Sequence, residues 1–261
     1  VLTAHQGEPR QSYGQDIADP KGSVSVVDVA AGTATVVTFD AFDAQRDQLV
    51  SAGIVLKKDT APSVDLEPEY IAVSGGNAYV TIQEANAIAV LDLTSKTFTG
   101  IYSAGFEDYS TTPVDIDKKD GAYGPKTYES LMGIRMPDGI AAFEQGGRTY
   151  LLTANEGDSR EWGDYLNEDE VNFGKEGNTS PTGAITAENS GLTGKVVFFL
   201  AGDYDGLNAE KDYLFGGRSF TLYEVTDTGI EEVFTSGDDF EALTARYFPD
   251  YFNASNDNAV K

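Results

Sequence analysis

The chain has 261 residues, of which 40% are hydrophobic, so it can bury a substantial core and is not wholly disordered. Its 43 acidic and 18 basic residues give a formal net charge of -25, which argues against nucleic acid and anionic membrane surfaces as partners, because both require basic patches. The absence of cysteine excludes disulfides and thiolate metal sites, and no apolar run is long enough to span a membrane.

The chain begins with a segment that recurs later. Residues 1–10, VLTAHQGEPR, align without gaps with residues 151–160, LLTANEGDSR, and residues 79–84, YVTIQE, are a looser copy. Residues 68–72, PEYIA, resemble residues 137–141, PDGIA, and each is followed by a Gly-Gly turn and a tyrosine-containing strand. Repeats of this size indicate an array of similar β units. The start at Val1, without methionine, leads us to expect a processed or trimmed chain.

Most of the remaining elements are predicted to be strands. Alternating apolar residues and turn signals predict strands over residues 23–29, 33–39, 69–74, 78–82, 87–93, 97–102, 140–143, 149–153, 195–200, 219–225 and 230–235. The Gly146-Gly147 pair supplies the positive φ angles that a tight hairpin requires. Helices are expected over residues 41–51, capped near Asp40 and ending at Gly53, and from Asp238 or Asp239 to Tyr247.

The order of the strands predicts the fold class. Four consecutive strands with short turns are typical of one blade of a β-propeller. Strands for three to five blades are present, whereas a closed propeller needs four to eight. We therefore expect an all-β, seven-bladed-like β-propeller, incomplete in this chain, with two short helices and long acidic loops over residues 105–130, 157–193 and 202–213. Residues 1–261 form one such domain, or a part of one that lacks its final blade or blades.

Several motifs resemble the choice-of-anchor I family of bacterial secreted and cell-surface proteins. The motifs are LEPEYIAVS (66–74), AYVTIQEANAIAVLDL (78–93), MPDGIA (136–141), TYLLTANEGDSR (149–160), GGRSFTLYE (216–224), SGDDFE (236–241) and FNASND (252–257). The resemblance implies a YncE-like β-propeller that is exported to the cell surface, the periplasm or the exterior. Some members of the family carry the name alkaline phosphatase, which implies a phosphorylated small molecule as a possible ligand.

The repeated acids are the first candidates for a site. Glu69 and Asp138 occupy equivalent positions after a proline, and Gln6, Glu84 and Glu156 occupy equivalent positions after a strand. Equivalent positions of a radially repeated fold converge on its axis, where a ring of carboxylates would bind Ca²⁺. The alternative is that these acids cap turns by accepting backbone N–H groups.

Other acids and two arginines are further candidates. Asp158 follows Glu156 in the same loop, and two loops place oxygen donors at alternate positions, Asp203 with Asp205 and Asp115 with Asp117; neither loop fits an EF-hand. Arg160 and Arg218 could hold a phosphate, although a salt bridge is the commoner role for an arginine beside acids.

These observations predict a cell-surface binding or scaffold module that binds calcium. A calcium-dependent phosphoesterase is the first alternative, with Glu156, Arg160 and Arg218 as candidate catalytic residues and Glu69, Asp138 and Glu156 as metal ligands. A structural subunit of a surface assembly is the second. Its partner would be another protein, a component of the cell surface or the remainder of the same polypeptide.

Overall fold

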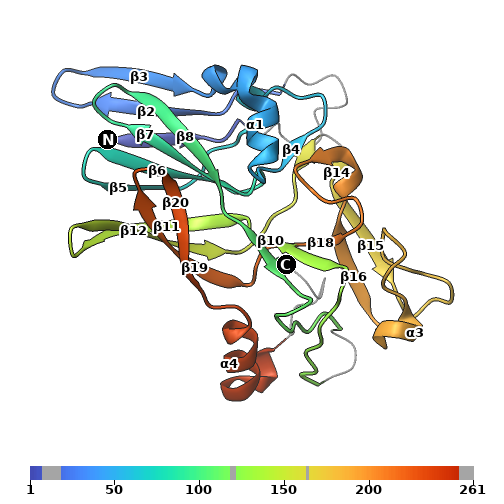
Figure 1. Cartoon of the computed structure of the whole chain (residues 1–261). Coiled ribbons are helices and arrows are strands. Elements are labelled where there is room, and N and C mark those ends of the chain that lie inside the picture. Colours follow the sequence, from blue (N-terminus) through green and yellow to red (C-terminus); the bar gives the residue numbers. More distant parts are fainter. Residues whose placement is uncertain (8–18, 118–121, 163–164, 253–261) are drawn as a thin grey trace.

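The computed structural model of the protein describes residues 1–7, 19–117, 122–162 and 165–252. Three wholly antiparallel sheets of three or four strands, called the larger sheets below, have the strand orders β1-β2-β3, β5-β6-β7-β8 and β11-β12-β19-β20 (Figure 1). The strands of these sheets are β1 (Leu2–His5), β2 (Ser23–Asp28), β3 (Thr33–Thr38), β5 (Ile71–Ser74), β6 (Asn77–Ile82), β7 (Ala87–Asp92), β8 (Thr97–Ser103), β11 (Pro137–Gln145), β12 (Arg148–Asn155), β19 (Ser219–Thr226) and β20 (Gly229–Thr235).

The predicted hairpins are confirmed. Strand β11 turns into β12 through Gly146 and Gly147, whose φ angles are 61° and 78°. Only glycine adopts two successive positive φ angles without strain, so this pair fixes the register in which Gln145 faces Arg148.

The sequence repeat corresponds to a structural repeat. His5 and Thr3 of β1 face Ser23 and Ser25 of β2, just as Asn155 and Thr153 of β12 face Ser219 and Thr221 of β19, as the two registers show. The polar side chains also pair alike: the His5 ring lies 2.9 Å from Ser25 Oγ, and Asn155 Nδ2 donates to the equivalent Thr221 Oγ1 at 2.8 Å. The two loops that follow both turn at a glycine, with a φ of 87° at Gly7 and 92° at Gly157.

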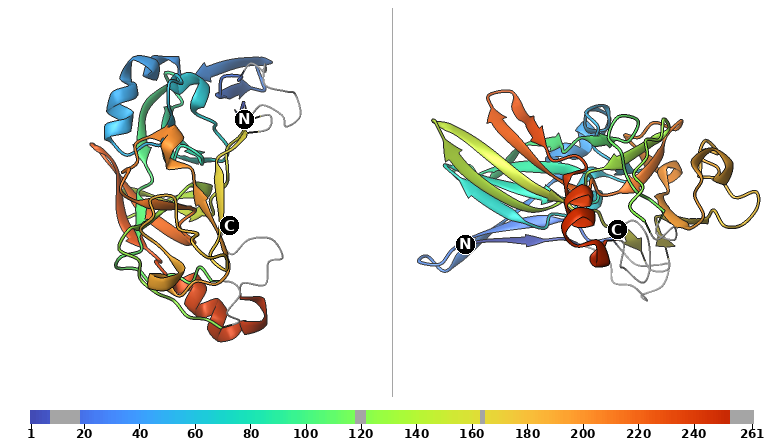
Figure 2. Two further views of the ribbon diagram at one scale, coloured as in Figure 1. Left: turned by 90° about the vertical axis from the view of Figure 1, so that its right-hand side faces the viewer. Right: turned by 90° about the horizontal axis from the view of Figure 1, so that it is seen from below.

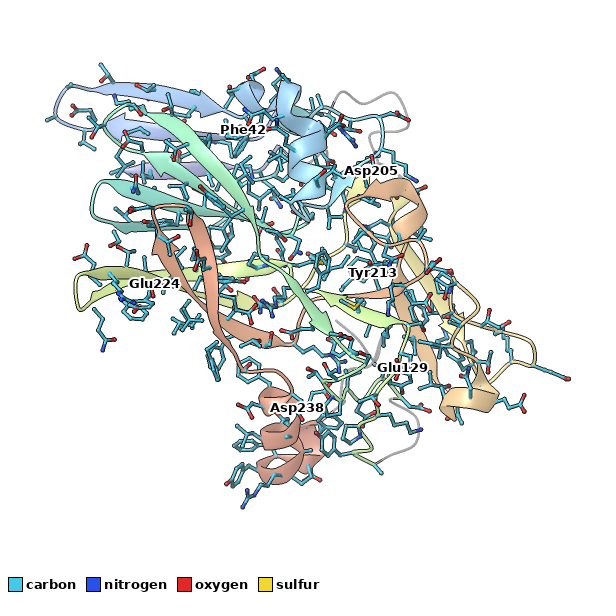
Figure 3. All side chains as sticks on the ribbon, viewed as in Figure 1. Phe42, Glu129, Asp205, Tyr213, Glu224 and Asp238 are labelled. Carbon is cyan, nitrogen blue, oxygen red and sulfur yellow. The ribbon has the colours of Figure 1, made fainter. Side chains whose placement is uncertain are left out.

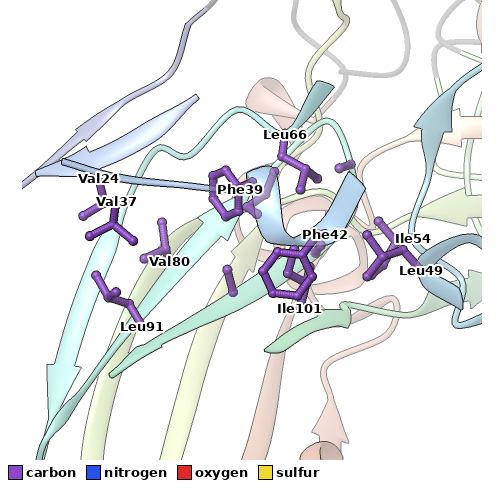
Figure 4. Close-up of a cluster of buried hydrophobic side chains, with 14 of the residues drawn as sticks. Val24, Val37, Phe39, Phe42, Leu49, Ile54, Leu66, Val80, Leu91 and Ile101 are labelled. Atoms are coloured by element: carbon purple, nitrogen blue, oxygen red, sulfur yellow. The ribbon is translucent and has the colours of Figure 1, made fainter. Parts of the chain in front are cut away.

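The three larger sheets pack on one another in chain order. One cluster joins the first sheet to the second through side chains such as Val24, Val37, Val80 and Leu91, together with Phe39 (Figure 4). The opposite face of the second sheet meets the third sheet in another cluster, which consists of Tyr79, Ile88, Val90, Leu151 and Tyr223. The second sheet is therefore covered on both faces, which explains why β6 and β7 are almost entirely buried.

A second region, built from the insertions between these sheets, has two cores of its own. It lies beside the stacked sheets, as two further views show (Figure 2). The long acidic loops predicted over residues 105–130, 157–193 and 202–213 contain short strands, and apolar residues of the second one, such as Val171, Phe173 and Ile185, are buried. Its strands are β4 (Leu56–Lys57), β9 (Phe106–Asp108), β10 (Leu131–Ile134), β13 (Glu161–Trp162), β14 (Tyr165–Leu166), β15 (Glu168–Asn172), β16 (Lys195–Phe199), β17 (Tyr204–Asp205) and β18 (Asp212–Phe215).

The two predicted helices are present, but their caps differ. The first begins as a 3₁₀ helix, η1 (Asp40–Gln45), and continues as α1 (Arg46–Ser51). It has no side-chain cap, because its N-cap position is Phe39, which carries no acceptor, and Asp40 inside the helix pairs with Lys21. The second is α4 (Asp239–Tyr247), which lacks a side-chain cap as well. The further short helices are α2 (Pro62–Asp65), α3 (Ala187–Ser190), η2 (Ala201–Asp203) and η3 (Pro249–Tyr251).

The fold is mainly β, as expected. Its sheets are separate, and the described residues form no closed barrel, so the propeller stays a prediction. Within the same residues, no helix is both long and apolar enough to cross a membrane.

Candidate functional site

The repeated acids meet in one cleft of about 470 Å³. Its lining comes from segments far apart in the sequence: Ala4, Gln6, Pro68, Glu69, Tyr70, Gln83, Asp138, Glu156 and Asp158. The cleft lies where β1, the segment before β5, the end of β6, β11 and the loop after β12 come together. The structure thus brings together four of the predicted site residues, Glu69, Asp138, Glu156 and Asp158.

Glu69 has a strongly perturbed carboxyl group. Burial, followed by the negative charges of Glu84 and Asp138, raises its pKa to about 9. Gln6 Nε2 donates a hydrogen bond of 2.9 Å to Glu69 Oε1, and Asp138 shares a hydrogen bond with Glu69. At neutral pH, Glu69 therefore keeps its proton, because burial and then the neighbouring acids disfavour its charged form.

Gln83 is a polar residue of the cleft wall. Its side chain is 4% exposed, and its Nε2 has no hydrogen-bond partner within the described part of the chain. A buried amide without a partner costs about 1–3 kcal/mol. This group is therefore available to water or a ligand that enters the cleft.

A buried ion-pair cluster lies next to the cleft. Arg160 Nη1 contacts Asp65 Oδ1 at 2.8 Å and Glu67 Oε1 at 3.3 Å, and all three side chains are nearly inaccessible to water. Burial alone would lower the pKa of Arg160, but Asp65 and then Glu67 raise it. The pKa of Glu67 rises to about 8 because burial and the nearby acids, Glu84 first, outweigh the guanidinium.

This cluster links the cleft to Asp19. Burial and the charge of Asp65 raise the pKa of Asp19 to about 6, against the lowering effect of Arg160. Acidic side chains thus continue from Glu69 through Glu84 and Glu67 into the interior. One arginine cannot neutralise several carboxylates, so this part of the protein favours protonated acids or an added cation.

Neither candidate arginine lines the cleft. Arg160 is committed to the buried cluster, so the expected salt bridge exists, but with Asp65 and Glu67 and not with the neighbouring Glu156 or Asp158. Arg218 pairs with Glu241 of α4 and donates to the Asp115 carbonyl at 3.1 Å. Glu156 is the one candidate catalytic residue that lies in the cleft.

The two predicted calcium loops are not part of the cleft. Asp205 forms a 2.9 Å salt bridge with Arg46, near α1 (Figure 3), and Asp203 accepts a hydrogen bond from the Tyr165 hydroxyl. Asp115 accepts the backbone N–H groups of Asp117 and Gly124.

Asp117 also accepts a backbone N–H group, since its Oδ2 accepts the Thr193 N–H at 2.7 Å. Asp120, the last acid of that loop, lies outside the described residues. In both loops, contacts with backbone N–H groups, a guanidinium or a hydroxyl thus engage oxygens that an open calcium loop would use for the ion.

Sequence reasoning missed the inner acids of this region. Asp65, Glu67 and Glu69 alternate with Leu66 and Pro68 in the sequence, a period of two that places them on one side of an extended chain. This alternation in the sequence could have identified Asp65 and Glu67 as companions of Glu69. The remote partner Arg160, by contrast, follows Asp65 by 95 residues and had no local signal.

Carboxylate oxygens are the ligands that calcium prefers, so the composition of the cleft suits a hard divalent cation. The arrangement is not a finished coordination sphere. In residues 1–7, 19–117, 122–162 and 165–252, no group of three or more His, Cys, Asp or Glu side chains stands ready to hold a metal ion. Metal binding would require the acids to turn toward one another.

Comparison with known proteins gives the family. No curated protein matches the chain significantly. The family model described as the choice-of-anchor I domain matches residues 1–261, and this agrees with the motifs noted in the sequence. The chain therefore belongs to the choice-of-anchor I family, a family of domains from cell-surface or secreted proteins.

Proposed function

We propose that this chain is a cell-surface binding module whose acidic cleft binds a divalent cation, with calcium as its natural occupant. The observation that carries the proposal is the meeting of Glu69, Asp138, Glu156 and Asp158 in one cleft. Two of these residues follow the equivalent prolines of the repeat, and Glu156 ends an equivalent strand. Solubility alone explains acids on a surface, but not their convergence from separate repeats.

The raised pKa of Glu69 supports this proposal. A proton on Glu69 relieves repulsion from Glu84 and Asp138, and a divalent cation would relieve it more completely. Calcium accepts six to eight oxygen ligands in flexible geometry, so small side-chain rotations and bound water could complete its shell. Magnesium demands a tighter octahedron and is expected to bind more weakly.

We also propose that the larger sheets are blades of a β-propeller. The three larger sheets pack face to face in chain order, and the second and third start from a strand beside the cleft, β5 or β11. This is the order that radially arranged blades would have. The cleft would then lie near the axis of the ring, with its acids supplied by the second and third sheets.

No observation favours the phosphoesterase alternative. Its mechanism needs a cation to hold the phosphate beside the metal, but neither Arg160 nor Arg218 lines the cleft. Both guanidinium groups pair with carboxylates elsewhere. We therefore favour binding over catalysis for the cleft.

Calorimetric titration with CaCl₂ tests the proposal. The unchanged protein is expected to bind calcium, and the double variant Glu69→Gln/Asp138→Asn is expected to lose at least tenfold in affinity, equivalent to about 1.4 kcal/mol. MgCl₂ serves as the comparison cation.

The matched control is Glu176→Gln/Asp227→Asn, which makes the same two kinds of substitution at exposed positions. It corrects for the general attraction of cations to a protein of net charge -25. Equal calcium affinity for both double variants would refute the cleft as the binding site.

A further inference from the structure

A mainly apolar pocket of about 680 Å³, called the lysine pocket below, shares no lining residue with the acidic cleft. Its wall runs from Val50 of α1 to the segments on both sides of β17. Phe199 and Tyr204 line it, and their ring centroids lie 4.8 Å apart. Phe199 also packs against Phe215, with 5.2 Å between the ring centroids. The volume falls within the range of about 300–1,000 Å³ that is typical of sites for small molecules.

The loop after β17 forms one wall of the lysine pocket and is held firmly in place. Gly206 has a φ of 91°, and a Cβ at this position would lie 2.3 Å from the Ile54 carbonyl oxygen. Two residues later, the Asn208 N–H donates to the Tyr213 hydroxyl at 2.8 Å. Close packing at one end and a hydrogen bond to a buried tyrosine at the other indicate a pocket that exists before any ligand binds.

Two lysines belong to the lining of this pocket, Lys58 and Lys211. Lys58 Nζ donates to the Gly202 carbonyl at 2.5 Å, and Lys211 Nζ donates to the Glu129 carbonyl at 2.6 Å. In the part of the chain that the structure describes, neither lysine forms a salt bridge. Each ammonium group therefore keeps N–H donors for an anion that enters the pocket.

The two acids of the lining already have partners. Asp205 forms its 2.9 Å salt bridge with Arg46. Asp212 is buried, and its two oxygens accept the N–H and the hydroxyl of Thr182 at 2.9 Å and 2.8 Å. Because these carboxylates are engaged elsewhere, they do not satisfy the lysines. The chain has 43 acidic and only 18 basic residues, so two cations without a carboxylate at one pocket are a specific feature.

We propose that the lysine pocket binds a small organic anion with an apolar body, of the class of medium-chain carboxylates. The apolar body would lie against Phe199 and Leu207, where it loses contact with water. The carboxylate would pair with Lys58 or Lys211, and hydrogen bonds between charged groups are stronger than those between neutral groups. This ligand site is separate from the proposed cation site and does not depend on it.

The charges of the lining favour this ligand over two others. An organic cation would meet both ammonium groups, whereas a neutral apolar molecule would displace water from them and offer no acceptor in return. The net charge of -25 opposes the approach of any anion from a distance. At about 0.15 M salt, however, exposed charges more than about 8 Å away are largely screened, so the groups that line the pocket decide the affinity.

Calorimetric titration with sodium octanoate in about 0.15 M NaCl tests the proposal, with 1-octanol and octylammonium chloride as the matched neutral and cationic probes. Octanoate is expected to bind at least about tenfold more tightly than octanol, and octylammonium is expected not to bind. Equal affinities for octanoate and octanol, or no saturable binding of octanoate, would overturn the proposal.

Two sets of variants locate the binding. Lys58→Gln/Lys211→Gln should weaken octanoate binding at least about tenfold, whereas Lys96→Gln/Lys175→Gln, which removes two lysines outside the lining, should leave it unchanged. Ala209→Trp places a large side chain at the exposed wall of the pocket and should abolish binding. Circular dichroism checks that each variant is folded. Equal losses in the two double variants, or full affinity in Ala209→Trp, would show that octanoate binds elsewhere and would refute the site.

Discussion

Gln6 Nε2 donates a 2.9 Å hydrogen bond to Glu69 Oε1, which joins the end of β1 to the segment that leads into β5. This bond connects the first and second large sheets at the wall of the acidic cleft. Gln6 stands at the position that Glu84 and Glu156 occupy in the other copies of the repeat. One of three equivalent carboxylates is thus replaced by an amide that holds another acid in place.

Gln6→Glu restores the acid of the repeat. Without calcium, we expect the free energy of unfolding to fall by roughly 1–3 kcal/mol, because the Glu69 oxygen loses its donor and gains a negative neighbour. With calcium, the added oxygen should make the rise in melting temperature larger than in the unchanged protein. Thermal unfolding with chelator and with millimolar CaCl₂ measures both effects. Gln6→Met, which loses the bond without adding charge, is the control, and a similar calcium response in the two variants would contradict the expectation.

The raised pKa values predict how stability depends on pH. Folding raises the pKa of Glu67 to about 8 and that of Glu69 to about 9, from an ordinary value of 4.5. The folded protein binds these two protons more tightly than the unfolded chain does. Protonation of Glu67 and Glu69 therefore stabilises the fold fully below about pH 4.5, and this stabilisation is lost as the pH rises through 8 and 9. Each group contributes a slope of at most about 1.4 kcal/mol per pH unit.

Urea unfolding in chelator from about pH 5 to about pH 9 measures this dependence. We expect a steady decline and a shallower one for Glu69→Gln, which has no proton to lose at that position. Stability that increases over this range would contradict the raised pKa values.

The buried ion pairs of Arg160 predict a large loss on mutation. Arg160→Met removes the cation that faces Asp65 and Glu67, and uncompensated buried charge typically costs about 3–5 kcal/mol. The pair of Arg148 with Glu224 gives the control, because Arg148 is exposed and Arg148→Met should cost much less. Chemical denaturation of both variants makes the comparison. Similar losses would show that the buried cluster contributes no more than a surface pair.

A substitution at Gly157 tests the turn that follows the strand in two copies of the repeat, at Gly7 and at Gly157. The φ of Gly157 is 92°, and a Cβ at this position would lie 2.1 Å from the Gly216 nitrogen. Gly157→Ala should therefore cost more than about 3 kcal/mol, since backbone strain and overlap with a main-chain atom add together. Gly32→Ala meets nothing within 4 Å at a φ of 64° and should cost only about 1–2 kcal/mol. Equal melting temperatures for the two variants would be the contrary result.

Local patterns predicted the strands well. The glycine pair at residues 146 and 147 placed a turn correctly, and the alternating residues of β5 to β8 gave one four-stranded sheet. Repetition predicted that Glu69 and Asp138 have equivalent surroundings, and both line the cleft. These features depend on neighbours in sequence, so one chain was enough to find them.

Long-range pairing was beyond the sequence. Arg160 selects Asp65 and Glu67 over the acids beside it because the fold buries all three side chains together. Asp117 has the spacing of a calcium ligand, yet its oxygen accepts Thr193 N–H, 76 residues later. Both outcomes depend on which loop packs against which, and no local pattern encodes that.

An anomalous difference map from crystals of the protein grown with calcium tests the central claim most directly. We predict a peak in the acidic cleft, about 2.3–2.6 Å from oxygens of Glu69 and Asp138 and from at least one of Glu156 and Asp158. A cleft without a peak at saturating calcium, or peaks confined to the loops of Asp115 or Asp205, would contradict the assignment of the cleft as a cation site.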